Sequence, residues 1–346
     1  MSFKMKCIAF AVLAGAWAST AQAGPILDDI KSKDKLICIV NPNSPGFSVP
    51  DSQGQFKGFN VEFCRMTAAA IFGDANKAEM RGVGFSDSLK ALISGSAHIA
   101  SRGITQTATR DADPGLAFVV PTFYDSQGFM VEKSLGMKGL EDLNGATICA
   151  EEGSTTLLYL ADWFGAAGLE YKVENIADKT ARLQAFFSGK CDAVASTISA
   201  LAADRLLAPN PDDYVLMPQG GASEPLSLVS RPDTELQKIL FWSVQVMLNA
   251  EAYGITSANV EEKLAALDTL PVDAQRLISP EGPTADMAQK LGLVPDWSVQ
   301  IIKQVSNYGE VFERTIGKGS PLGMERADMA NRLSRDGGLL FSYPIR

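Results

Sequence analysis

A helix–turn–strand unit occurs twice in this chain and constrains the fold more than any other feature. The copies run over residues 89–101 and 183–195, and both contain Leu-x-Ala, two bulky apolar residues and Ser-Gly. Apolar residues recur at helical spacing up to the Ser-Gly, where the glycine ends the helix and a short apolar strand follows. Strand-forming runs at 36–40 and 146–150 precede the copies. Alternating strands and helices predict parallel α/β sheets, and two distant copies predict two lobes with a ligand cleft between them.

The first 23 residues have the pattern of a secretory signal peptide. Lys4 and Lys6 precede an apolar run that ends at Trp17, and Ala21-Gln-Ala23 fits a cleavage site. We therefore expect export and cleavage after Ala23. No cysteine follows at the cleavage point, so we expect no lipid anchor. No later stretch reaches about 18 uninterrupted apolar residues, so we expect a soluble mature chain.

The charge balance disfavours one class of partner. The chain has 31 Lys and Arg against 40 Asp and Glu, and losing Lys4 and Lys6 with the signal moves the net charge from −9 to −11. An acidic chain of this kind argues against nucleic acid as a partner. It is compatible with a small anionic ligand, because a local arginine can dominate the field of a pocket.

Four cysteines remain in the mature chain: Cys38, Cys64, Cys149 and Cys191. An even number in an oxidising compartment predicts disulfides, and four cysteines allow three connectivities. Proximity in the sequence favours Cys38–Cys64 and Cys149–Cys191. No two cysteines have metal-ligand spacing and His98 is the only histidine, so we expect no metal or cofactor and a packing role for His98.

Polar side chains gather where the strand of the first repeat ends. Within nine residues the chain offers Arg102, Thr105, Thr107, Thr109 and Arg110. A guanidinium matches a carboxylate as a two-pronged donor, and ligands bind at the carboxyl ends of strands in open α/β sheets. The local string alone fits a solvated loop with a structural arginine equally well.

A second polar cluster follows the strand at 146–150. The run Gly153-Ser154-Thr155 precedes a predicted helix over 157–164. Backbone N–H groups at a helix N-terminus favour an anion, although such hydroxyls are also ordinary N-caps. A position opposite the Arg110 loop would favour the ligand-binding interpretation.

Several motifs occur in a characteristic order. They are Gly58-Phe-Asn-Val61, Leu89-x-Ala-Leu-x-Ser-Gly95, Thr105…Arg110-Asp111, Tyr124-Asp-Ser-Gln-Gly-Phe129 and Gly153-Ser-Thr155. With the signal peptide, this order resembles the family 3 solute-binding proteins of polar amino-acid ABC transporters. The strings at 307–313 and 337–346 resemble the periplasmic general L-amino-acid-binding branch. The resemblance covers essentially the whole mature chain.

The resemblance implies a periplasmic, two-lobed α/β fold of type II, with two parallel-rich sheets flanked by helices and a two-strand hinge. The hinge crossings would lie near 124–129 and 222–226. Lobe 1 would comprise 24–125 and 225–346, with helical patterns at 260–267 and 297–308, and lobe 2 would comprise 126–224. The implied function is that of a monomeric, non-enzymatic receptor that delivers an L-amino acid or related carboxylated solute to a membrane ABC permease.

The resemblance also assigns ligand-binding residues. Arg110 would clamp the α-carboxylate, and Thr105 and Gly103 would face the ligand beside Arg102. From the other lobe, the Gly153 loop would offer the hydroxyls of Ser154 and Thr155. The ring of Phe47 would lie over the ligand.

The chain departs from the family pattern where the ligand ammonium is bound. Thr197 stands where the family usually has an aspartate, and losing one partner of a buried ion pair costs about 3–5 kcal/mol. Three explanations remain open. Glu152 or Glu151 could take over the ammonium, the ligand could lack a free α-ammonium, or the register could slip so that Asp204 or Asp87 serves. Asn60 likewise replaces a usual aspartate, and His98 stands where the second repeat has Asp192.

Two other functions remain as alternatives. A periplasmic dehydratase acting on cyclic amino acids or prephenate-like acids could use the same fold, and Glu152 could then supply an acid or base. A receptor that signals to a separate membrane protein is the third alternative.

Overall fold

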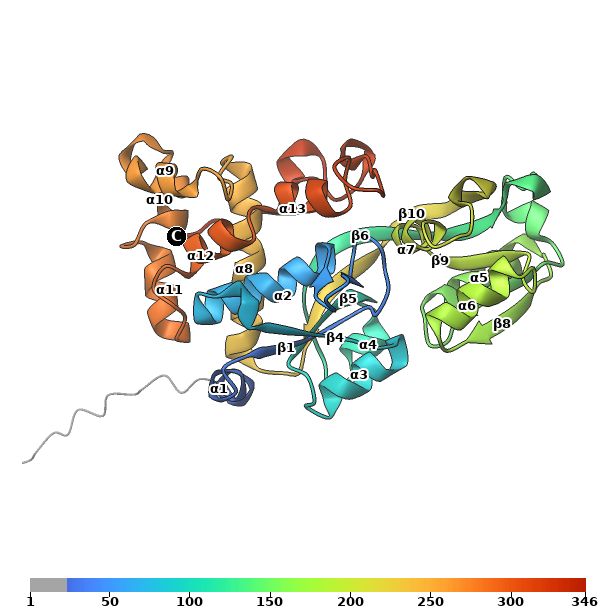
Figure 1. Cartoon of the computed structure of the whole chain (residues 1–346), viewed down its shortest axis with the longest axis horizontal. Helices are drawn as coiled ribbons and strands as arrows, with labels where there is room; N and C mark the ends of the chain where they lie inside the picture. Colours follow the sequence, from blue (N-terminus) through green and yellow to red (C-terminus); the bar gives the residue numbers. More distant parts are fainter. Residues whose placement is uncertain (1–23) are drawn as a thin grey trace, which may run out of the picture.

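The computed structural model describes residues 24–346, and the predicted signal peptide lies outside that range. An eight-stranded mixed sheet runs through the molecule in the order β4-β1-β5-β10-β6-β9-β7-β8 (Figure 1). Its strands are β1 (Leu36–Val40), β4 (Ala78–Gly82), β5 (Ile99–Thr105), β6 (Ala117–Glu132), β7 (Thr147–Glu151), β8 (Lys172–Ile176), β9 (Ala193–Thr197) and β10 (Tyr214–Ser230). A short hairpin pairs β2 (Val49–Pro50) with β3 (Phe56–Lys57).

The two parallel-rich sheets expected from the sequence are the two halves of this one sheet. Strand β1 pairs in parallel with β4 and β5 in the first half, and β7 pairs in parallel with β8 and β9 in the second. The long antiparallel strands β6 and β10 extend through both halves and join them (Figure 1). The predicted two-lobed α/β fold is confirmed, and both predicted hinge crossings fall in these two strands.

Helices cover both halves of the sheet. In the first half they are α1 (Pro25–Ser32), α2 (Phe59–Phe72), α3 (Phe85–Ile93) and α4 (Ala108–Asp111). In the second they are α5 (Thr156–Ala167), α6 (Lys179–Phe187) and α7 (Ile198–Arg205). The chain ends with α8 (Thr234–Ala252), α9 (Val260–Ala265), α10 (Val272–Ile278), α11 (Pro283–Leu291), α12 (Trp297–Gln304) and α13 (Tyr308–Thr315).

The C-terminal helices extend the first half rather than forming a separate unit. Helices α8 and α12 pack against α2, and their apolar residues belong to the same core as strand β1 (Figure 1). The pattern at 297–308 predicted one helix, but the structure has two. Ser306 takes a φ of +90°, and the side chain of Asn307 caps the N-terminus of α13, so the chain turns between them.

Both copies of the repeat form the predicted unit. Helices α3 and α6 each end at the residue directly preceding the Ser-Gly pair. Gly95 and Gly189 each take a φ of +76°. Only glycine adopts this left-handed conformation without steric cost, so the Ser-Gly pair ends both helices. A strand follows in each case and pairs in parallel with the first strand of its half.

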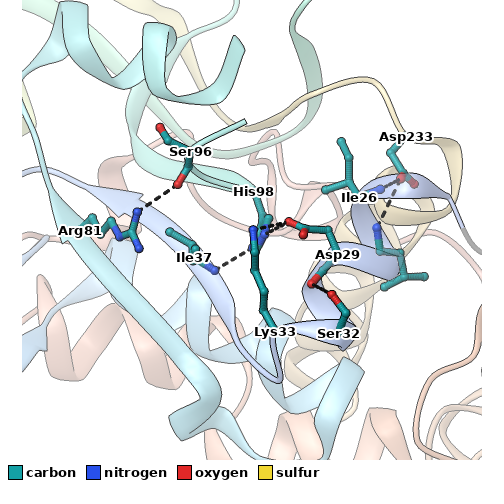
Figure 2. A network of polar contacts seen from close by, with 10 residues as sticks. Ile26, Asp29, Ser32, Lys33, Ile37, Arg81, Ser96, His98 and Asp233 are labelled. Carbon is teal, nitrogen blue, oxygen red and sulfur yellow. Dashed lines mark hydrogen bonds and ion pairs between the residues drawn. The ribbon is translucent and has the colours of Figure 1, made fainter. Parts of the chain in front are cut away.

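His98 and Asp192 occupy equivalent positions in the two repeats, and each accepts a hydrogen bond from a backbone N–H of the preceding strand region. His98 Nδ1 accepts a hydrogen bond from the Ile37 N–H at 2.9 Å, and Asp192 Oδ2 accepts one from the Thr147 N–H at 2.8 Å. Since Nδ1 is an acceptor, the proton of the neutral ring is on Nε2, which lies 3.0 Å from Asp29 (Figure 2). His98 is fully buried, and burial lowers its pKa.

Helix α1 is fastened to the body by a second contact. The Asp233 carboxylate accepts from the Ile26 N–H at 2.8 Å (Figure 2). It also caps helix α8 by accepting from the Leu236 N–H. One buried side chain thus satisfies free donors at the starts of two helices. The start of the described chain therefore packs as part of the first half.

One disulfide in each half joins a strand to a helix or a loop. Cys38 of β1 is bonded to Cys64 of α2, and Cys149 of β7 is bonded to Cys191, just before β9. These are the pairs that sequence proximity favoured. Each half also has apolar clusters of its own, and the cluster around β1 and α2 also includes Ala203 of α7.

Candidate ligand-binding site

The polar loop after β5 reaches across to the second half. Thr107 caps the short helix α4 by accepting from the Arg110 N–H at 3.3 Å. The Arg110 guanidinium donates to the carbonyl oxygen of Thr105 at 2.9 Å and to that of Gly153 at 3.1 Å. Because Gly153 belongs to the loop after β7, this arginine joins the two polar loops that the sequence singled out.

One aromatic ring supports two guanidinium groups. Phe85, the first residue of α3, has its ring centroid 4.8 Å from Arg110 Cζ and 5.1 Å from Arg102 Cζ. Burial lowers the pKa of both arginines, and a carboxylate opposes that effect in each case, Glu151 for Arg102 and Glu224 for Arg110. Cations over a ring face are stabilised by its quadrupole. The first half therefore presents two positive charges toward the junction.

A cavity of about 90 Å³ lies between the halves beside these groups. Eight of the ten predicted ligand-binding residues line it: Phe47, Arg102, Gly103, Thr105, Arg110, Ser154, Thr155 and Thr197. The other two do not. Gly153 contributes only its carbonyl to Arg110, and Glu152 is exposed, whereas Glu151, the last residue of β7, lines the cavity.

The predicted aromatic residue lies at the base of the cavity. Phe47 is buried and meets Phe59 and Phe123 edge to face, with ring centroids 6.0 and 5.9 Å apart. Edge-to-face pairs of this kind are favourable contacts between aromatic rings. The ring is therefore held rigidly by the core of the first half where it borders the cavity.

Glu224 is a site residue that the sequence analysis did not identify. It is 1% exposed, and its Oε2 accepts from the hydroxyls of Thr105 and Thr155, the latter at 3.1 Å. Its Oε1 is buried with no hydrogen-bond partner among residues 24–346. The carboxylate thus joins the two halves directly behind the cavity wall. Its signal in the sequence was a lone acidic residue in a predicted hinge crossing.

Asp125 is the second carboxylate that the sequence analysis did not assign to the site. It faces Glu224 in the register of β6 and β10 and is buried beside the start of α7. Burial raises its pKa to about 6, against hydrogen bonds from Ser199, Ser126 and Thr197. Thr197, the residue in the family's aspartate position, therefore contacts a carboxylate supplied by the hinge.

The two aspartates considered for a register slip lie elsewhere. Asp204 is buried in the second half, where its carboxylate is 2.7 Å from Arg182 and 2.6 Å from Lys179. Asp87 is exposed beside Lys90. Neither lines the cavity, whereas Asn60 does. Over residues 24–346 we also find no group of three side chains suited to a metal ion.

The first half and the start of the second match a known family model. Residues 36–162 match the model of the bacterial extracellular solute-binding proteins, family 3. A glutamate/glutamine/aspartate/asparagine-binding protein, BztA of Rhodobacter capsulatus, is 39% identical over 345 residues, which cover 99% of this chain and all of BztA. The chain belongs to family 3 of the extracellular solute-binding proteins.

Other comparisons agree. The general L-amino acid-binding periplasmic protein AapJ of Rhizobium johnstonii is 37% identical over the full length of both chains. A periplasmic binding protein from Brucella ovis, solved with glutathione bound, superposes with a TM-score of 0.86 at 39% identity, covering 92% of this chain and 99% of that one. BztA and AapJ are named as amino-acid-binding proteins and the Brucella ovis protein as a periplasmic binding protein of an ABC transporter, and the matched family is extracellular. None of the helices within 24–346 is long and apolar enough to cross a membrane.

Proposed function

We propose that this protein is the periplasmic substrate-binding subunit of an ABC importer and captures an α-amino acid between its two lobes. The observation that carries the proposal is the Arg110 guanidinium, which reaches from the loop after β5 to Gly153 in the opposite half. A ligand carboxylate bound to Arg110 would contact both halves and so favour their closure. Hinge closure around a ligand is a known motion of periplasmic binding proteins.

We assign the two lobes to residues 24–125 with 225–346 and to residues 126–224. The signal peptide would be removed after Ala23, and the mature monomer would dock on a membrane permease in its closed form. The full-length relatives are named as amino-acid-binding proteins, which supports the ligand class of the proposal. The glutathione of the Brucella ovis structure also carries an α-amino-acid head group.

Opposite charges are arranged as an α-amino acid requires. Arg110 would bind the α-carboxylate, and the Gly103 backbone would face the ligand. The Ser154 and Thr155 hydroxyls border the cavity from the second lobe, where they already donate to the Glu151 carbonyl and to Glu224. The Thr105 hydroxyl already donates to Glu224, so its lone pairs are free to accept from an ammonium. Glu224 offers a buried oxygen that has no partner among the described residues.

This arrangement favours an ordinary ammonium over the alternatives. Glu224, with Asp125 behind Thr197, would supply the negative charge that Thr197 cannot. A relocated site at Glu152 is disfavoured because that side chain is exposed. A dehydratase is disfavoured too. The full-length relatives are named as binding proteins, and Asp125 already accepts hydrogen bonds from the backbone and the side chain of Ser199.

The test is calorimetric binding of L-amino acids and their deaminated analogues to mature protein freed of copurified ligand. Arg110→Met should lower affinity for every carboxylate ligand by roughly 30-fold or more, the effect of truncating one partner of a buried charge pair. Arg81→Met, at an exposed arginine outside the cavity, is the matched control. Unchanged affinity in Arg110→Met would refute the clamp.

Glu224→Gln tests the ammonium assignment. The variant should lose most of the preference for an L-amino acid over its deaminated analogue while still binding the analogue. If the preference is retained, Glu224 does not bind the ammonium. Turnover of any ligand in the panel by the pure protein would contradict the receptor function itself.

A further inference from the structure

A second cavity adjoins the first across the junction between the halves. It measures about 290 Å³ and shares Asn41, Arg102 and Glu151 with the smaller cavity. Arg102 comes from β5 in the first half and Glu151 from β7 in the second. These two charged side chains therefore stand at the neck between the cavities.

The charge of Arg102 has no full partner. Its side chain is 6% exposed, and its Nε is buried without a hydrogen bond within the described residues. Its one hydrogen bond joins Nη1 to Ser88 Oγ at 3.5 Å, which is long for such a contact. The buried Arg182, by contrast, has the Asp204 carboxylate at 2.7 Å. Burying a charge without an ion partner is costly, so Arg102 is suited to an anionic group supplied by a ligand.

The second cavity continues the path beyond the neck. Helix α6 supplies one wall with the apolar Leu183 and Phe187 and the polar Thr180 and Gln184, and the loop at 41–43 supplies another. Lys179 lies at its border but is already paired with Asp204 at 2.6 Å. Arg102 is thus the cation at this border that has no carboxylate within ion-pair distance among residues 24–346. The space can hold a chain longer than that of a small neutral amino acid.

We propose that the preferred ligand is an α-amino acid with an extended side chain that ends in a second carboxylate, and that Arg102 binds this carboxylate at the neck. The proposal rests on the proposed function, because Arg110 must hold the α-carboxylate for the side chain to point toward Arg102. Arg102 then sets specificity. The second cavity admits side chains lengthened by an amide linkage.

The test compares Arg102→Met with wild type against four probes: L-glutamate, γ-glutamylglycine, L-glutamine and L-alanine. Methionine keeps the apolar stem over Phe85 and removes the charge. At least one dicarboxylic probe should lose about 30-fold or more in affinity, while the two neutral probes change by less than about threefold. Arg102→Lys, which keeps the charge but not the planar fork, should lie between the two.

A purely structural role for Arg102 predicts the opposite effect on the melting temperature. Removing a structural arginine would lower the melting temperature of the ligand-free protein, whereas removing a buried unpaired charge should leave that temperature unchanged or raise it. Equal losses for acidic and neutral probes would overturn the assignment of Arg102 while leaving amino-acid binding intact. If wild type binds none of the four probes, the second-carboxylate ligand is overturned, and if it binds no L-amino acid of the wider panel either, the proposed function fails as well.

A second variant tests the larger cavity without touching the charge. Gln184 is exposed on α6 and lines this cavity. Gln184→Trp should fill the space and weaken γ-glutamylglycine by about 10-fold or more, with no loss for L-alanine. Equal affinity of the variant and wild type for γ-glutamylglycine would show that the ligand does not enter the second cavity.

Discussion

Asn331 completes the free edge of the hinge strand β6. This fully buried side chain accepts from the Tyr124 N–H at 2.7 Å and donates to the Tyr124 carbonyl at 2.8 Å. Pro225 faces Tyr124 in the register of β10 and has no N–H of its own. The backbone groups of Tyr124 therefore point away from β10 and depend on a residue of the C-terminal segment.

Asn331→Ala should destabilise the protein through these two groups. Each buried backbone group left without a partner costs about 1–3 kcal/mol. Tyr124 is half-buried, so water can recover part of that loss. We expect the free energy of unfolding to fall by about 2–4 kcal/mol in total.

The assay is urea unfolding of mature protein without ligand. The midpoint of Asn331→Ala should fall clearly below that of Asn210→Ala, a substitution at an exposed position in the second half. Asn331→Asp keeps the acceptor and loses the donor, so it should recover part of the stability at most. A loss below about 0.5 kcal/mol for Asn331→Ala, the range of ordinary surface changes, would refute the reasoning.

Two further predictions concern pH and the disulfides. Burial lowers the pKa of His98, so the stability from its neutral form is present above pH ~6.5 and is lost as the pH falls through the lower folded value. Between pH 7 and 5.5, thermal melts of wild type should therefore lose more stability than those of His98→Asn, and parallel curves would contradict this. The pKa of Asp125 is raised to about 6, so its contribution to stability grows as the pH falls. That contribution is the same in wild type and in His98→Asn. Removing the Cys38–Cys64 bond by a double Cys→Ala change should cost about 3–4 kcal/mol in urea unfolding, and a loss under about 1 kcal/mol would show that the unfolded chain gains little freedom.

Local features of the fold could be predicted because their causes are local. The repeat placed two helices and two strands correctly, since apolar spacing defines a helix face and a Ser-Gly pair ends it within a few residues. The order of strands and helices then fixed the parallel pairing in each half. The single helix predicted over 297–308 was wrong, and the cause is again local. Apolar spacing continues through Ser306, but the turn there depends on a single backbone angle that spacing does not encode.

The residues of the site also divide into those that the sequence could predict and those that only the tertiary structure shows. The sequence alone determined the two polar loops at the ends of β5 and β7, because hydroxyls and a guanidinium at strand ends are visible in one short string. Only the tertiary structure decided that Glu224 meets Thr105, a contact between residues 119 positions apart. The unpaired charge of Arg102 is likewise a property of everything that surrounds it. A carboxylate in a long strand has no local signature of its partners, and burial, which gives these charges their strength, exists only once the two halves enclose them.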